Sequence, residues 1–389
     1  MKWEKKTLAE LCTKLTDGTH DSPKLQPAGM PFIKGIHVKQ GIIDFENCDY
    51  ITYEDHEKVI KRSKPERNDI LLANIGINIG ELGYVKTDNE FSIKNVALLK
   101  VNPEAIDSKY LYYNLRNPSQ QERLRNHKGG SAQPFLSLGT LRGYKIQFHK
   151  LNSTQRRIAS ILSAYDDLIE NNLKRIKLLE EKAFASYKLI VKSEKLEEFT
   201  IEEVCNTIGG GTPSTGNSSY WNDGEILWFS PTDLTKHHSI ILLDSEKKIT
   251  ELGLQKSSAK LVPPKTILMT SRASIGYFGL INKPASTNQG FINIIPFNET
   301  HRAYMLFDLK NRKEEIIGNA NGSTFLEISK GKFRQMKIKL PKDKKVLADF
   351  ETEFETTFNF IENLLKQNAC LREARDILLP KLMNGQIEV

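Results

Sequence analysis

The residues of this sequence that could do chemistry are polar side chains gathered in short loops. The loops mix lysine, arginine, amide and hydroxyl side chains with glycine, and they are TDGTHDSPK (16–24), KRSKPERN (61–68), NHKGGSAQ (126–133), SRAS (271–274), STNQG (286–290) and NANGS (319–323). Lysine and arginine neutralise phosphates, and Asn, Gln, Ser, Thr and Arg can hydrogen-bond to base edges. The loops therefore indicate a contact surface for a nucleic acid, with an ordinary polar surface as the alternative.

The sequence lacks the short motifs that mark most catalytic or cofactor sites. It contains no GxGxxG or P-loop motif for a nucleotide, and no HExxH, HxE…CxxC or GxSxG motif. The Asp/Asn/Ser-Pro-Pro-aromatic tetrapeptide of adenine-N6 methyltransferases is also absent. His20 follows a Gly-Thr turn without a visible carboxylate partner, so we expect a contact or solvent residue and not a catalytic base. Cys12 and Cys205 have apolar neighbours, which favours small core residues over nucleophiles.

The composition is that of a globular protein with a modest basic excess. The 389 residues include 56 Lys and Arg against 48 Asp and Glu, a net charge of +8. Such an excess favours a polyanionic partner, although a basic enzyme also fits. The four cysteines are widely spread without a CxxC pair, so neither a disulfide framework nor a cysteine-rich zinc site is expected. The start has no apolar stretch of signal-peptide length and no 18-residue apolar run follows, so we expect a cytoplasmic protein.

The chain repeats itself. Residues 130–150 align without gaps with residues 322–342, and 8 of the 21 pairs are identical. Further segments repeat at nearly the same offset, and they are 7–19 with 200–212, 69–83 with 266–279, and 169–174 with 361–366. The sequence therefore predicts a tandem duplication in which each half has a globular part followed by a helical part. Alternation of short apolar runs with turns predicts mixed β-structure in the globular parts, with a helix over 109–127 that restarts at Pro118.

Heptad patterns predict two long helices. Apolar residues recur with alternating spacings of four and three, as along a coiled-coil seam. The first seam is Ile158, Leu162, Tyr165, Ile169, Asn172, Ile176, Leu179 and Ala183. The second is Phe350, Phe354, Thr357, Ile361, Leu364, Asn368, Leu371, Arg375 and Leu378. We expect the second helix to end at Pro380.

One asparagine interrupts each seam, Asn172 in the first and Asn368 in the second. A buried seam asparagine costs stability and fixes register or partner number, whereas one that tilts out to water does neither. The sequence leaves both alternatives open. Because globular segments separate the two helices, we expect them to pair antiparallel. A helix of about 38 residues would be about 57 Å long, which predicts two related heads on a two-helix rod.

Several segments occur in an order that is similar to one known family. In the first half they are DGTH, PFIKGIHVKQGII, NDILLANIGINIG, FSIKNVALL and GGSAQPFLSLGTL, and in the second GGTPS, YWNDGEILWFSPTDL, ITELGLQKSSAKLVPPKTILMTSRASIGY and STNQGFINI. With the helical stretches 153–191 and 343–385, they resemble the specificity (S) subunit of type I restriction–modification enzymes, the HsdS family, over nearly the whole chain. The entries into the helices, HKLNSTQRR (149–157) and LPKDKKVLADF (340–350), depart from the usual family pattern.

The resemblance implies an α+β fold. It would be a tandem duplication of two globular target-recognition domains, separated by two long helices that form an antiparallel coiled coil. The implied domains are target-recognition domain 1 (1–152), helical spacer 1 (153–192), target-recognition domain 2 (193–342) and helical spacer 2 (343–389).

The resemblance also implies a function without catalysis in this chain. Each domain would read one half of a split site in double-stranded DNA, and the rod would set the gap. Two methyltransferase (modification) subunits, which methylate adenine N6, would pack on the helices, and restriction/translocase subunits would join them. S-adenosylmethionine, ATP and Mg are expected only in those partners. We expect no catalytic residue, cofactor, metal site or membrane contact in this chain.

The site residues that the resemblance implies are polar residues of loops and strand ends. The DNA-contacting candidates are Thr19, His20, Asn74, Asn78, Lys94, Asn95, Lys128, Ser131 and Gln133 in the first half, and Thr212, Ser214, Arg272, Ser274, Asn288, Gln289, Asn321 and Ser323 in the second. The candidates for packing in the coiled coil are Ile158, Leu162, Ile169, Ile176, Ile361, Leu364 and Leu371. Each DNA candidate could instead stabilise a turn.

Two other classes of function fit the residues alone. One is a coiled-coil scaffold whose heads bind proteins. The other is a stand-alone DNA nuclease or methyltransferase, against which the missing cofactor motifs count. Salt separates the first from a DNA-recognition subunit, because DNA binding weakens steeply with ionic strength.

Overall fold

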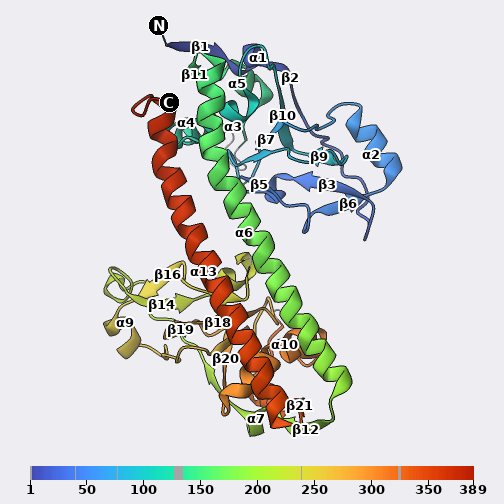
Figure 1. Ribbon diagram of the computed structural model, residues 1–389, viewed down its shortest axis with the longest axis vertical. Coiled ribbons are helices and arrows are strands. Elements are labelled where there is room, and N and C mark those ends of the chain that lie inside the picture. Colours follow the sequence, from blue (N-terminus) through green and yellow to red (C-terminus); the bar gives the residue numbers. More distant parts are fainter. Residues whose placement is uncertain (1, 40, 77, 127–134, 238, 323–325) are drawn as a thin grey trace. The chain divides into compact units, whose positions relative to one another are not determined.

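The computed structural model describes residues 2–39, 41–76, 78–126, 135–237, 239–322 and 326–389. Its contacts divide the chain into two compact units. Unit 1 contains residues 1–167 and 371–389, and unit 2 contains residues 168–370. Two long helices, α6 (Asn152–Ser193) and α13 (Lys344–Met383), each supply residues to both units. They are the green and the red helix of Figure 1.

Small β-sheets form the head of unit 1. Its strands are β1 (Trp3–Thr7), β2 (Cys12–Asp17), β3 (Met30–Lys34), β4 (Val38–Lys39), β5 (Ile42–Ile43), β6 (Asp49–Ile51), β7 (Ile70–Ala73), β8 (Leu82–Tyr84), β9 (Ser92–Lys94), β10 (Val96–Val101) and β11 (Lys145–His149). One sheet has the antiparallel order β2-β10-β7-β8. A second has the order β6-β3-β9, in which β3 runs parallel to β9. The pairs β1-β11 and β4-β5 are antiparallel.

Short helices connect these strands. They are α1 (Leu8–Leu11), the 3-10 turn η1 (Gly35–His37), α2 (Tyr53–Ile60), α3 (Ser108–Arg116), α4 (Pro118–Asn126) and α5 (Leu138–Gly143). The predicted helix over 109–127 is thus two helices, and the prediction that Pro118 starts the second is confirmed. Proline suits the first position of a helix because its missing N–H would have no intrahelical partner there.

Unit 2 repeats this head. Its strands are β12 (Leu196–Thr200), β13 (Cys205–Gly209), β14 (Ile226–Phe229), β15 (Ile241–Leu242), β16 (Lys247–Ile249), β17 (Ile267–Thr270), β18 (Phe278–Ile281), β19 (Ala285–Thr287), β20 (Phe291–Pro296) and β21 (Lys337–Pro341). The strand orders are β13-β20-β17-β18-β15, β16-β14-β19 and β12-β21. Its short helices are α7 (Ile201–Val204), η2 (Ser218–Tyr220), α8 (Pro231–Lys236), α9 (Glu251–Gln255), η3 (Glu299–His301), α10 (Arg302–Asn311), α11 (Lys313–Gly318) and α12 (Lys330–Gln335).

The duplication predicted from the sequence is confirmed at the level of strands and caps. The order β2-β10-β7-β8 corresponds to β13-β20-β17-β18, and the parallel pair β3-β9 corresponds to β14-β19. Both heads also begin with the same capping box, in which Thr7 and Glu10 exchange hydrogen bonds before α1 and Thr200 and Glu203 do so before α7. Such reciprocal bonds satisfy the free N–H groups at a helix start.

Each head has apolar side chains on both faces of its central strand. Ile70 and Leu72 of β7 point into the core that contains α3, and Leu71 points into the second core, under β3 and β9. This follows from the alternation of side chains along a strand. Strand β17 repeats the pattern, with Ile267 and Met269 in one core and Leu268 in the other. A strand covered on both faces must be apolar throughout, which explains the short apolar runs in the sequence at β7 and β17.

The larger core of unit 1 joins segments from both ends of the chain. It includes Leu8 and Leu11 of α1, Ile158 and Leu162 of α6, and the α13 residues Leu379, Leu382 and Met383. The head therefore packs on both long helices within this unit.

Helix α13 continues past Pro380 to Met383, so the expected end at Pro380 is wrong. A proline inside a helix removes one N–H···O bond, but its own carbonyl still accepts, here from the Asn384 N–H at 3.0 Å. Burial of Leu382 and Met383, which are 2% and 4% exposed, stabilises the last turn against that loss.

The two seam asparagines bind each other. Asn172 is 6% exposed and Asn368 is fully buried, and the Asn172 Nδ2 donates to the Asn368 Oδ1 at 2.9 Å. The alternative in which each asparagine tilts out to water is therefore wrong. A second contact confirms that α6 and α13 run antiparallel in unit 2, because Ser186, later in α6 than Asn172, meets Glu353, earlier in α13 than Asn368.

The other seam residues have these positions. Within unit 2, the side chains of Ile169, Ile176, Ile361 and Leu364 are buried. Within unit 1, Leu371 is half-buried. Across the described residues, no helix combines the length and the apolar composition that crossing a membrane requires.

Candidate nucleic-acid interface

In unit 1, the loop after β2 lies directly against strand β9. The Thr19 N–H donates to the Ile93 carbonyl at 3.0 Å, and Thr19 forms an isolated parallel bridge with Lys94. Gly18 permits this approach, because a Cβ there would come within 2.3 Å of the Ile93 oxygen. The loop thus brings two predicted site residues, Thr19 and Lys94, side by side.

His20 is held between two oxygen atoms. Its Nε2 lies 2.9 Å from the Asp17 Oδ2, and its Nδ1 lies 2.9 Å from the Asn95 Oδ1. Asp17 is 4% exposed and also binds Arg62, whereas the His20 side chain is 57% exposed. The expectation that His20 has no carboxylate partner is therefore wrong, because the carboxylate lies three residues earlier, at the end of β2. The arrangement orients an accessible imidazole beside Asn95.

Lys94 and Asn95 close this group of side chains. The Lys94 Nζ donates to the Ser22 Oγ, so it ties the loop to β9. Asn95 has a φ of +52°, a conformation that asparagine tolerates better than most residues. The structure thus brings Thr19, His20, Lys94 and Asn95 together at one end of the parallel pair β3-β9.

Asn74 and Asn78 contact the backbone of the same head. Asn74 is 4% exposed, and its Nδ2 lies 3.4 Å from the Leu136 carbonyl. The Asn78 Nδ2 donates to the Gly35 carbonyl at 3.2 Å. Both amides therefore hold loops in this arrangement. The predicted residues Lys128, Ser131, Gln133 and Ser323 lie outside the described residues.

In unit 2, the loop after β19 gathers a second group of predicted residues. The Thr212 Oγ1 donates to the Gln289 Oε1, which joins the loop after β13 to the loop after β19. The Asn288 N–H donates to the Phe229 carbonyl at 2.9 Å, and the Asn288 Oδ1 accepts from the Gly290 N–H at 2.8 Å. Thr212, Asn288 and Gln289 therefore share one surface.

Arg272 and Asn321 adjoin that surface through Glu327. Arg272 and Asn321 each form an isolated antiparallel bridge with Glu327. The Ser271 N–H donates to the Gly290 carbonyl at 2.8 Å, which places the Arg272 loop beside the Asn288 loop. Sequence reasoning missed Glu327, although the 192-residue offset could have singled it out as the counterpart of an apolar residue in the first half.

Ser214 and Ser274 have exposed side chains. Their carbonyls are used within the head, that of Ser214 by the Trp221 Nε1 at 3.0 Å and that of Ser274 by the Thr270 Oγ1. Among the described residues, neither hydroxyl has a hydrogen-bond partner, so both stay predictions as ligand contacts.

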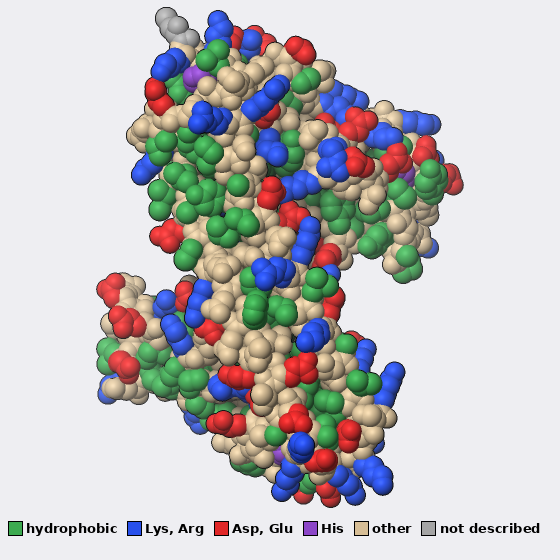
Figure 2. All heavy atoms as spheres, in the orientation of Figure 1, with side chains coloured by type: hydrophobic (Ala, Val, Ile, Leu, Met, Phe, Trp, Pro, Cys, Tyr) green, Lys and Arg blue, Asp and Glu red, His purple; other side chains and the backbone are tan. Residues whose placement is uncertain are grey.

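Charges of both signs are mixed on the surface. Figure 2 shows Lys and Arg side chains interspersed with Asp and Glu over the displayed face. The displayed face therefore has no uniformly basic field.

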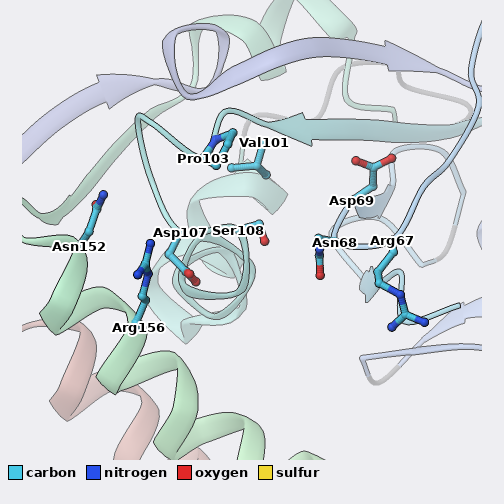
Figure 3. A pocket seen from close by; sticks show the side chains of 9 residues that line it. All are labelled: Arg67, Asn68, Asp69, Val101, Pro103, Asp107, Ser108, Asn152 and Arg156. Carbon is cyan, nitrogen blue, oxygen red and sulfur yellow. The ribbon is translucent and has the colours of Figure 1, made fainter. Parts of the chain in front are cut away.

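A cavity of about 300 Å³ lies elsewhere in unit 1. Figure 3 shows the residues that line it, which are Arg67, Asn68, Asp69, Val101, Pro103, Asp107, Ser108, Asn152 and Arg156. Much of its polar lining is already paired. Arg67 binds Asp88 through two hydrogen bonds, the Lys100 Nζ lies 2.8 Å from Asp69, and Asp107 caps α3. We therefore assign it no ligand.

The two equivalent cysteines are placed as core residues. Burial raises the pKa of both the Cys12 and the Cys205 thiol to about 12, so neither is a thiolate at neutral pH. Among the described residues, no group of three or more His, Cys, Asp and Glu side chains is placed to hold a metal ion.

Comparison with known proteins finds similarity along most of the chain. A family model described as "Type I restriction modification DNA specificity domain" matches residues 1–181 and again residues 193–368. The specificity subunit of the type I restriction enzyme MjaIX from Methanocaldococcus jannaschii is 36% identical over 177 residues, 44% of this chain and 40% of that protein. The EcoR124I/EcoR124II specificity subunit of Escherichia coli is 30% identical over 193 residues, 48% of this chain and 47% of that protein. These matches span less than half the length of either relative.

Two longer matches have lower identity. The putative MjaX specificity subunit of M. jannaschii is 23% identical over 100% of this chain and 94% of its own length. The crystal structure of the type I restriction–modification S subunit from M. genitalium superimposes with a TM-score of 0.57 at 20% identity, covering 98% of this chain and 96% of that one. The latter comparison shows that the two share a fold.

Proposed function

Since this chain belongs to the family of type I restriction modification DNA specificity domains, we propose that it is the DNA-recognition subunit of a type I restriction–modification complex. The observation that carries the proposal is the repetition of one polar loop arrangement in two heads. In unit 1, the loop after β2 meets the end of β9, at Thr19 with Lys94, and in unit 2 the loop after β13 meets the loop after β19, at Thr212 with Gln289. Two copies of one contact surface suit a partner that itself has two separate halves.

Each head would read one half of a split site. Amide, hydroxyl and guanidinium groups can hydrogen-bond to base edges in the major groove, while lysine neutralises phosphates. The two heads carry different residues at some equivalent places, as at Lys94 and Thr287, each of which precedes an asparagine. The two half-sites would therefore differ in sequence.

The partners and cofactors follow from this role. Two modification subunits would dock on this chain, bind S-adenosylmethionine and methylate adenine N6 after extruding the base. Restriction subunits would use ATP and Mg for translocation and cleavage. In this proposal, the chain contributes binding and orientation without a catalytic step, and it acts on DNA in the cytoplasm.

Base-resolution mapping of methylated adenines tests the proposal. The chain is produced in cells with its neighbouring modification subunit, and the control cells lack this chain. We expect one split motif, with a methylated adenine in each half on opposite strands. Replacing residues 1–152 with those of another specificity chain should change one half only. The absence of any difference, with the modification subunit active beside another specificity chain, would refute the proposal and favour a protein-binding scaffold.

A further inference from the structure

One pair of loop positions is equivalent in the two heads but differs in chemistry. Ile75 forms an isolated antiparallel bridge with Phe135 in unit 1, and Arg272 forms the same bridge with Glu327 in unit 2. Phe135 and Glu327 are separated by the 192-residue offset of the repeat. Ile75 and Arg272 are each the second residue after the central strand, β7 or β17. The duplication thus serves as an internal comparison at this position.

The backbone around the pair is also repeated. The residue after each position has a positive φ, +90° at Gly76 and +61° at Ala273. The neighbouring hydrogen bond recurs too, from Leu136 to the Asn74 carbonyl at 2.8 Å and from Ile328 to the Ser271 carbonyl at 3.0 Å. A side chain at positive φ is uncommon, so its retention at Ala273 indicates that the turn itself is required. Within this repeated backbone, the side chains of the bridged pair change from apolar in unit 1 to charged in unit 2.

In unit 2, the pair presents a guanidinium. The Arg272 Nε lies 3.8 Å from the Glu327 Oε2, and both side chains are about half exposed. Within the described part of the chain, the two terminal nitrogens of Arg272 have no hydrogen-bond partner. Such a free edge matches the O6 and N7 acceptors of guanine in the major groove.

Arg272 also lies within the candidate interface. A Cβ built on Gly290 would lie 3.9 Å from the Arg272 Cβ and 3.1 Å from the Asn288 Oδ1. The guanidinium therefore originates beside the predicted contact residues Asn288 and Gln289.

In unit 1, the same position is apolar. The Phe135 side chain is 43% exposed and Ile75 is half-buried. Neither side chain can hydrogen-bond to a base, but an exposed aromatic ring can pack on the C5-methyl group of thymine.

We propose that this bridged pair is a specificity-determining element, in which Arg272 recognises a guanine in the half-site of unit 2 and Phe135 contacts a thymine methyl in the half-site of unit 1. Glu327 is a positioning residue, because it acts on the base through Arg272. The inference rests on the proposed function, since it requires each head to face DNA.

The test is selection of randomised duplexes by the assembled complex of this chain with its modification subunits, followed by sequencing. Arg272→Lys keeps the charge and removes the two-pronged donor. We expect the preference for guanine at one position of one half-site to fall by about five- to 150-fold, with the other half-site unchanged. Arg157→Lys, at an exposed arginine of α6, is the matched control and should leave every position unchanged.

Two further variants extend the test. Glu327→Gln removes a negative charge near DNA, so we expect binding to all sequences to strengthen while the guanine preference falls. The double substitution Ile75→Arg with Phe135→Glu should replace a thymine preference with a guanine preference in the other half-site. Retention of the preferences of the unaltered head shows in each case that the complex is assembled and folded.

The outcomes separate the inference from the proposed function. If the unaltered complex selects no split motif, the proposed function fails. If it selects one, but Arg272→Lys leaves the preferences intact or weakens all sequences equally, Arg272 contacts no base and the inference is overturned. A motif without guanine in the half-site of unit 2 overturns it as well.

Discussion

At the scale of single residues, Asp166 is the centre of a charged network in unit 1. Its carboxylate accepts from the Arg116 Nη1 at 2.8 Å, from the Arg375 Nη1 at 2.5 Å and from the Tyr113 hydroxyl at 2.7 Å. Burial alone would raise the pKa of Asp166, but the two arginines outweigh it and hold this pKa below its usual value. The network joins α3 of the head to both long helices.

Replacing this carboxylate should destabilise unit 1. Asp166→Asn leaves Arg116 and Arg375, whose side chains are 14% and 11% exposed, without their shared anion. Removal of one partner from a buried ion pair costs about 3–5 kcal/mol. Urea unfolding measures the loss. Asp376→Asn, at an exposed partner of Arg375, is the control and should cost about 1 kcal/mol or less. Equal losses in the two variants would contradict a special role for Asp166.

The pH dependence of this network has a definite sign. Because the pKa of Asp166 is lowered by folding, its contribution to stability is present above the unfolded value of about 3.9 and is lost as the pH falls below it. We expect the difference in unfolding free energy between the parent chain and Asp166→Asn to shrink below about pH 4. A constant difference down to pH 2 would refute this assignment.

Glu180 should show the opposite sign. Burial raises the pKa of Glu180, although it accepts from the Ser239 hydroxyl at 2.7 Å and the Ile240 N–H at 2.8 Å. Its stabilising contribution is therefore complete below the unfolded pKa of about 4.3 and is lost as the pH rises through the folded value. Glu180→Gln keeps an acceptor without the charge, so its advantage over the parent chain should grow as the pH rises from 4 to 8. If the unfolding free energies of the parent chain and Glu180→Gln, measured in urea, change in parallel with pH, the buried charge of Glu180 is not the cause.

At the residue scale, the sequence could predict which loops are polar but not which side chains pair. The partner of His20 was missed because the turn after β2 brings Asp17 back onto the imidazole, and local spacing does not show that. The role of Asn74 as a buried backbone contact depends on Leu136, which lies 62 residues away. Such contacts arise from the tertiary fold.

At the scale of elements, the Asn172–Asn368 pair tests the pairing of the long helices in unit 2. Asn172→Leu leaves Asn368 buried without that partner, which should cost about 1–3 kcal/mol. The double substitution Asn172→Leu with Asn368→Leu removes both polar groups and should be at least as stable as the parent chain. A double-mutant cycle of unfolding free energies, measured in urea, gives the coupling free energy between the two side chains. Additive losses would show that the two amides do not depend on each other.

The long helices and the central strands were predictable because their sequence patterns are local. The heptad spacing identifies the seam, and uninterrupted apolar runs identify β7 and β17. The end of α13 was not predictable from Pro380 alone, because burial of the residues after it stabilises the last turn. Tertiary packing overrides a local breaker there.

At the scale of the whole molecule, the salt dependence of DNA binding should separate charge from base recognition. The logarithm of the affinity should fall linearly with the logarithm of the salt concentration, with a slope of about −0.9 per phosphate neutralised. Arg272→Lys keeps its charge, so the slope should stay the same while sequence preference changes. Fluorescence anisotropy with a labelled duplex measures both. A flat salt response of the parent complex would favour a protein-binding scaffold.

The larger core of unit 1 also has a consequence for synthesis. It needs Leu379, Leu382 and Met383, whereas its other buried residues lie in the first segment of unit 1, which ends at Asp167. At about 5–20 residues per second, a ribosome takes roughly 11–43 s to make the 216 residues from Asp167 to Met383 (383 − 167). Throughout that time the apolar face of α1, α3 and the start of α6 has no cover from α13. The first head to be translated is thus the last to be finished. A nascent chain that stalls between Asp167 and Met383 exposes an apolar surface that chaperones or proteases can bind.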